Sequence, residues 1–126
     1  MELTDQAKRD ILNCVMEEVA LISNKERQKK RWIQGEGPDF DETVCVFLHE
    51  GDGVLEKFKD FGITECQYRI LKKFRDDFEA FADENDWPPA FIDTPEWTKI
   101  TLMAKKVLEV FKYQSRDGNS VNEREP

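Results

Sequence analysis

The chain has 126 residues, of which 39% are hydrophobic and 37% are charged, and its formal net charge is −8. This length corresponds to a single domain, and the hydrophobic and aromatic content is too high for a disordered chain. The negative charge argues against binding to nucleic acid or to anionic membranes, both of which attract basic surfaces.

The N-terminus has neither the basic start nor the apolar run of a signal peptide, and no segment reaches the roughly 18 apolar residues of a membrane span. Three cysteines, Cys14, Cys45 and Cys66, are widely spaced and odd in number. This pattern predicts reduced, partly buried thiols in a reducing compartment. We therefore expect a cytoplasmic protein.

The first predicted helix is capped by Thr4 and runs to about Trp32, because apolar residues recur three or four positions apart along it. Its last turns contain a basic run, residues 25–31 (KERQKKR), with five cations and one acid. Cations are favoured at the C-terminal end of a helix, so the run is accounted for by the helix dipole or by a salt-bridge network. Contact with phosphate is the less favoured interpretation.

Two short helices are predicted next, after a loop at residues 34–40 (QGEGPDF) that contains two glycines and a proline. Asp41 caps the first short helix, which the glycines of residues 51–53 end. Residues 54–61 form the second short helix, and Gly62 ends it in a left-handed conformation.

A long helix then begins at Thr64, which has the capping-box spacing with Gln67. Its apolar stripe and its ion pairs both follow helical spacing. The stripe contains Ile70, Phe74, Phe78 and Phe81, and the pairs are Lys72 with Asp76, Lys73 with Asp77 and Arg75 with Glu79.

Pro88 and Pro89 end that pattern, so residues 85–93 are predicted to form a connecting loop. The last helix starts at Thr94-Pro95-Glu96, where Thr supplies a cap, Pro needs no donor and Glu meets the positive helix end. Residues 114–126 are almost entirely polar and predict a disordered tail. The fold class is all-α: residues 1–113 form a single-domain bundle or orthogonal array of about five helices, three long and two short.

No motif for catalysis is present. The single histidine, His49, has Cys45 at helical spacing but no second histidine, so an exposed or capping role is favoured over a metal site. With 27 acids some carboxylates lie close together in any fold, and their abundance does not indicate a hydrolase. We expect a non-enzymatic protein without cofactor or metal.

Charge is distributed unevenly, with 17 acids and six bases between residues 34 and 96. The stretch DDFEAFADENDW, residues 76–87, places acids toward a helix C-terminus, where each costs about 0.3–1 kcal/mol. One interpretation is a solvated loop that keeps the protein soluble, with the tryptophan packed on Trp97 or Phe91. The other is a protein-binding site with an aromatic anchor, which contains Asp76, Asp77, Glu79, Asp83, Glu84, Asp86 and Trp87.

Two functions remain open. The first is an inhibitory partner of a basic protein, comparable to an immunity protein or an antitoxin, which the concentrated negative charge favours. The second is a helical adaptor or scaffold domain that binds a partner through an apolar groove, which the apolar residues between Trp87 and Ile92 favour.

Overall fold

The computed structural model describes residues 3–37 and 39–113, and within them the chain forms helices and no strands. The all-α fold class is therefore confirmed. In chain order the elements are α1 (Asp5–Ile22), α2 (Lys25–Gln28), the π-helical turn η1 (Lys29–Ile33), α3 (Phe40–Glu56), α4 (Glu65–Glu84), α5 (Pro88–Phe91) and α6 (Pro95–Phe111).

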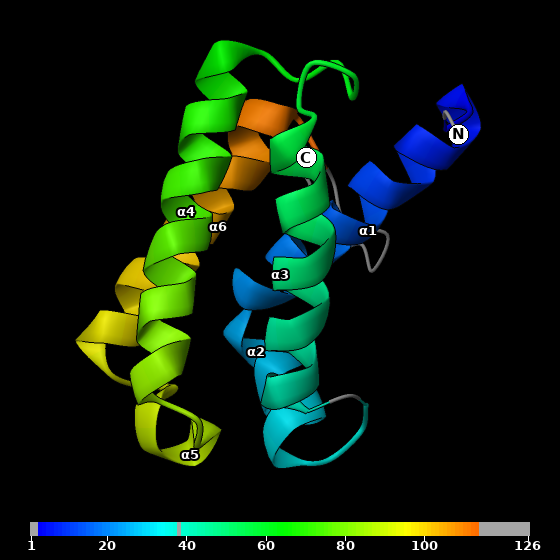
Figure 1. The fold of residues 1–126 in the computed structure, drawn as a ribbon. Coiled ribbons are helices and arrows are strands. Elements are labelled where there is room, and N and C mark those ends of the chain that lie inside the picture. Colours follow the sequence, from blue (N-terminus) through cyan, green and yellow to red (C-terminus); the bar gives the residue numbers. More distant parts are fainter. Residues whose placement is uncertain (1–2, 38, 114–126) are drawn as a thin grey trace, which may run out of the picture.

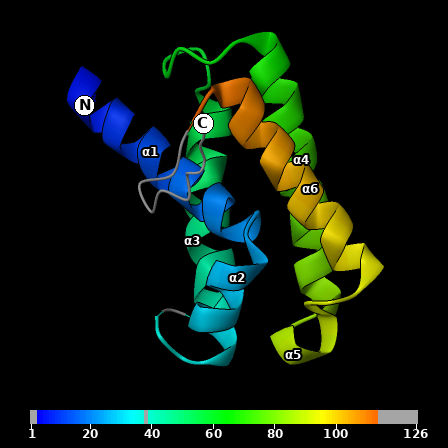
Figure 2. The same ribbon diagram turned by 180° about the vertical axis from the view of Figure 1, so that it is seen from behind.

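The four long helices form a closed arrangement, in which α1 packs on α3 and α6, and α4 packs on α3 and α6. Figure 1 shows α3 and α4 side by side, with α6 behind α4 and α1 crossing at a steep angle. Seen from behind in Figure 2, the N-terminal half of α1 extends beyond the other helices. The short α5 lies at the end of the bundle where α4 ends and α6 begins.

Aromatic rings fill the core around Trp97, which is fully buried. Edge-to-face and tilted contacts of this kind add to the stabilisation from buried apolar area. Five rings have centroids between 4.9 and 6.3 Å from that of Trp97, those of Trp32, Phe40, Phe78, Phe81 and Phe91.

Three of the predicted helix starts, at Thr4, Thr64 and Thr94, are confirmed. Thr4 and Thr94 accept hydrogen bonds from backbone N–H groups of the first turns of α1 and α6. Thr64 and Gln67 form the reciprocal capping box, with the Thr64 N–H donating to Gln67 Oε1 at 2.9 Å. The left-handed conformation of Gly62 is also confirmed, at φ +74°.

The prediction that the first helix continues to Trp32 is wrong, because α1 ends at Ile22 and Asn24 caps α2. Gln28 stabilises this break from inside the core. Its Nε2 donates to the carbonyls of Leu21 and Ile22 at 2.9 and 2.8 Å, and its Oε1 accepts from Trp97 Nε1 at 2.8 Å. A buried side chain thus supplies the donors that a continued helix would have supplied.

The predicted pair of short helices is also wrong. Asp39, not Asp41, caps α3, which runs through both glycines of residues 51–53 to Glu56. A glycine inside a helix costs about 1 kcal/mol relative to alanine. The burial of Val54 and Leu55 after the glycines offsets this cost, and residues 57–62 then form turns. The described chain therefore has four long helices where three were predicted.

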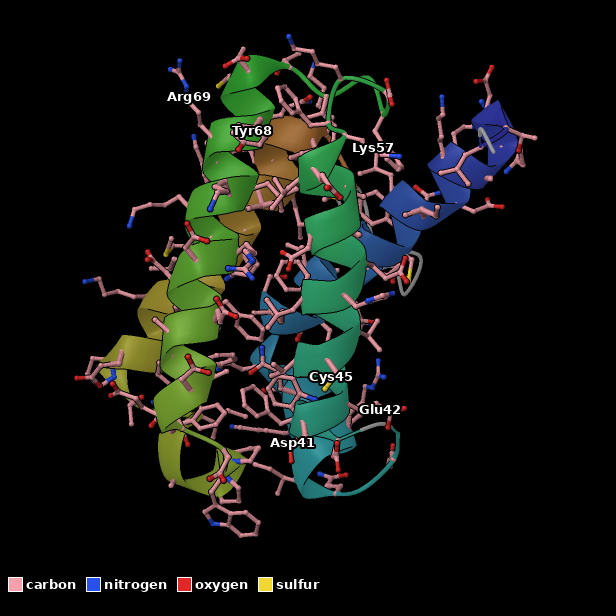
Figure 3. The ribbon with its side chains drawn as sticks, viewed as in Figure 1. Asp41, Glu42, Cys45, Lys57, Tyr68 and Arg69 are labelled. Carbon is pink, nitrogen blue, oxygen red and sulfur yellow. The ribbon has the colours of Figure 1, made fainter. Side chains whose placement is uncertain are left out.

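Two smaller predictions are also wrong. The predicted loop at residues 85–93 contains the short helix α5. The cysteines, predicted to be partly buried, are exposed, and Figure 3 shows Cys45 on the outer side of α3 near Asp41 and Glu42. The predicted disordered tail, residues 114–126, lies outside the described residues.

Candidate functional site

The seven residues of the predicted binding site fall into two groups. The first group lies within α4 and is engaged in the predicted ion pairs, which are all present. The nitrogen–oxygen distances are 2.9 Å for Lys72 and Asp76, 2.8 Å for Lys73 and Asp77, and 2.7 Å for Arg75 and Glu79. The hydrogen bond from Lys72 lowers the pKa of Asp76. These carboxylates are already neutralised within their own helix.

Arg75 also joins α4 to α3. Its Nε and Nη2 donate to the two oxygens of Asp52 at 2.7 and 3.2 Å, and its side chain is only 17% exposed. This two-point contact raises the pKa of Arg75 above its ordinary value. Sequence reasoning missed Asp52, because no local spacing connects residues 23 positions apart.

The second group, which we call the acidic lip, comprises Asp83, Glu84, Asp86 and Trp87. All four residues are exposed, and the Trp87 side chain is 65% exposed. Within residues 3–37 and 39–113 none of the three carboxylates forms an ion pair. The lip therefore presents negative charge beside an exposed aromatic ring.

The backbone under the acidic lip is well held. Asn85 ends α4 in an extended conformation, and its Nδ2 donates to the Phe81 carbonyl at 3.0 Å. The Trp87 carbonyl accepts from the Ala90 N–H at 2.9 Å, at the start of α5. The interpretation that the Trp87 ring packs on Trp97 or Phe91 is not supported, because no such ring pair occurs in the described part of the chain. The backbone at Trp87 is therefore anchored, and its ring is in contact with solvent.

A groove lies between α4 and α6 next to the acidic lip, and Glu84 belongs to both. Its volume is about 520 Å³. The floor is apolar and includes Phe81, Phe91, Ile100 and Met103, while the rim carries Asp77, Glu84, Glu96 and Lys99. Sequence reasoning did not find this groove, since its walls come from helices that are separated by the whole α5 connection.

The basic run is partly folded inward. Lys25 Nζ donates to Thr98 Oγ1 at 2.9 Å, and Arg27 lies 4.0 Å from Glu17. The Arg31 side chain passes so close to Gly37 that an added Cβ there would lie 3.0 Å from its Nε. These contacts favour the structural interpretation of the run over contact with phosphate.

Two kinds of residue in the described ranges bear on chemistry: potential metal ligands and reactive cysteines. No group of three or more histidine, cysteine or acidic side chains there could hold a metal ion. His49 is exposed. Desolvation by neighbouring atoms, together with Glu18 and Glu50, raises the pKa of the exposed Cys14 thiol, whereas a reactive cysteine needs a lowered pKa. No helix in the described part is long and apolar enough to cross a membrane.

Comparison with known proteins finds no matching protein family, no matching curated protein and no matching solved structure. The class that the fold itself defines is that of small all-α helical bundles.

Proposed function

We propose that this chain is a non-enzymatic binding protein that docks its acidic lip on a basic protein and blocks that protein's activity, as an immunity protein or an antitoxin does. The carrying observation is the state of the lip: three exposed carboxylates without ion partners in the described chain lie within four residues of an aromatic side chain that is 65% exposed.

Local stability does not account for this arrangement. Asp83 and Glu84 lie in the last turn of α4, where the helix end carries partial negative charge, and that turn contains no basic residue. Each such acid costs about 0.3–1 kcal/mol, whereas a bound cation would gain from the same field. An exposed tryptophan surrounded by charge is also the usual composition of an interface anchor and its rim.

The acids in the middle of α4 are less suited to recognition. Asp76, Asp77 and Glu79 already bind lysine or arginine of the same helix, so a partner would have to displace those contacts. We therefore restrict the proposed surface to the acidic lip.

The second candidate function is that of a helical adaptor. The observation in its favour is the groove between α4 and α6, because its apolar floor could bind a partner's apolar side chains without charged contacts. An adaptor of this kind would form a complex that is insensitive to salt, whereas a complex formed through the lip is weakened by salt.

Affinity capture from the native organism's lysate tests the proposal, with the immobilised chain as bait at low and at moderate salt. The inhibitor hypothesis predicts one basic protein in stoichiometric amount that elutes as salt is raised and whose own activity the chain suppresses. A salt-insensitive complex of several subunits would support the adaptor function instead.

Two baits of equal charge make the test specific. The variant with Asp83, Glu84 and Asp86 changed to Lys should lose the basic protein. The control with Glu36, Glu56 and Asp60 changed to Lys alters net charge equally, at exposed positions outside the lip, and should retain it. Equal loss from both baits would mean that capture depends only on overall charge, and the lip would then have no specific role.

A further inference from the structure

The groove between α4 and α6 is open because small side chains stand at its mouth. Ala80 of α4 and Ala90 of α5 are exposed at the edges, while the larger Phe81 and Ile100 form the floor behind them. The volume of about 520 Å³ lies within the range of roughly 300–1,000 Å³ that is typical of ligand pockets. One large apolar side chain inserted from outside would be removed from water there.

The charges at the rim indicate what accompanies that apolar side chain. Asp77 is neutralised by Lys73, and Glu96 is accounted for by the first turn of α6, where acids are favoured. Glu84 has neither explanation, because it lies at the unfavourable end of α4 and forms no ion pair within the described ranges. Lys99 is the one cation among the residues that line the groove. With Asp77 neutralised by Lys73, the carboxylates of Glu84 and Glu96 outnumber it, so the rim keeps a net negative charge and favours a positive group beside Glu84.

We propose that the groove receives one large apolar side chain from a basic linear segment of the partner, while an adjacent arginine or lysine of that segment meets Glu84. This inference rests on the proposed function, since it names the part of the basic partner that is recognised. The negative rim disfavours nucleic acid as the occupant. Apolar insertion of a single side chain adds to the affinity, while the acidic lip supplies the salt-sensitive attraction without which the complex dissociates as salt is raised.

A titration of the ¹⁵N-labelled full chain, followed by NMR chemical shifts, tests this directly. The probes are the blocked peptides acetyl-Gly-Arg-X-Arg-Gly-amide, in which X is leucine, methionine, phenylalanine or alanine. At least one of the three peptides with a large side chain should change the amide chemical shifts of Ala80, Ala90 and Met103. Its Kd should be at least tenfold lower than that of the alanine peptide. Replacing both arginines of the best peptide by glutamate should abolish the shifts.

Variants of the chain separate insertion from surface attraction. Ala80→Leu fills the groove without changing charge and should raise the Kd of the best peptide at least tenfold. Cys66→Leu adds the same side chain at an exposed position in the first turn of the same helix and should leave the Kd unchanged. Circular dichroism establishes that both variants are folded.

The outcomes distinguish this inference from the function on which it rests. Insertion into the groove is refuted if no peptide changes the chemical shifts of the groove amides, or if Ala80→Leu binds the best peptide as tightly as the parent does. This holds even if the variant with Asp83, Glu84 and Asp86 changed to Lys fails to capture the basic protein. If Ala80→Leu abolishes peptide binding while the lip variant still captures its partner, the groove is a binding site and the acidic lip is not. Self-association of the chain through the groove, seen by analytical ultracentrifugation, would also overturn the proposal.

Discussion

Replacing Gln28 by methionine removes a set of hydrogen bonds from the core while nearly conserving side-chain volume. Gln28 is completely buried and bonds to the carbonyls of Leu21 and Ile22 and to the indole of Trp97. The Leu21 carbonyl keeps a second donor, the Asn24 N–H at 3.1 Å. Two groups, the Ile22 carbonyl and the Trp97 Nε1–H, therefore lose their partner in the described structure.

An unsatisfied buried group costs about 1–3 kcal/mol, so the two groups together predict a loss of about 2–6 kcal/mol. This is a large share of the roughly 5–15 kcal/mol by which domains are stable. Urea denaturation followed by circular dichroism and tryptophan fluorescence measures the loss. With a slope of about 1–3 kcal/mol per molar urea, a loss of about 3 kcal/mol lowers the midpoint by about 1–3 M.

The control is Gln6→Met, which changes the same residue type at an exposed position of α1 and should alter stability by no more than about 0.5 kcal/mol. If Gln28→Met costs less than about 1 kcal/mol, the reasoning is refuted. The break between α1 and α2 would then be maintained by packing rather than by the Gln28 amide.

Further predictions concern charge. Changing Asp83 and Glu84 to Lys should raise the free energy of unfolding by about 0.6–2 kcal/mol, measured by thermal denaturation at low salt, because acids are disfavoured and cations favoured at the end of α4; a loss of stability would contradict this. Asp52→Asn should cost about 1 kcal/mol, and 1 M salt should reduce this loss, since the variant breaks the contact between Arg75 and the 53% exposed Asp52 carboxylate; a salt-independent loss would point to packing instead. Burial raises the pKa of Glu18, which makes its ionised form unfavourable in the folded state. Glu18→Gln should therefore be more stable than the parent at pH 7. The difference in the free energy of unfolding should shrink as pH falls through the raised pKa of Glu18 and disappear below the ordinary value of 4.5. If the variant were still more stable below that pH, the raised pKa would not be the cause.

The features predicted correctly from the sequence are those that depend on neighbours within a turn or two. The capping box of Thr64 and Gln67 is an example, as is the pairing of Lys73 with Asp77 four residues away. In each case both partners belong to one helix, and helical geometry alone brings them together. The acids of α4 could be located by the same reasoning.

The features predicted wrongly depend on contacts between distant segments. The end of α1 is stabilised by Gln28, whose own partner Trp97 lies 69 positions further along the chain. The continuity of α3 through its glycines accompanies the contact of Asp52 with Arg75 on the neighbouring helix. Local propensity favours a break at glycine, and tertiary packing overrides that preference in α3. At residue 24 the local signal already favours a break, because Asn is a preferred N-cap and Asn24 caps α2; the prediction followed the apolar spacing instead.

The candidate site shows the same division. The exposure of Asp83 and Asp86 follows from their place after the last apolar residue of α4, and it could be expected from the sequence. The groove beside them could not, because it forms where Phe81 and Ile100, from two different helices, lie behind the small side chain of Ala80.

The central place of Trp97 has a consequence for synthesis on the ribosome. Chains grow from the N-terminus at about 5–20 residues per second, and a nascent chain that stops before Pro95 contains α1 to α5 without the ring that fills their common core. Trp32, Phe40 and Phe91 then retain ring contacts with one another but lack the Trp97 ring that all three contact in the folded domain. Until α6 has left the exit tunnel, these rings stay available to chaperones, and the domain completes its folding only after release of nearly its whole length.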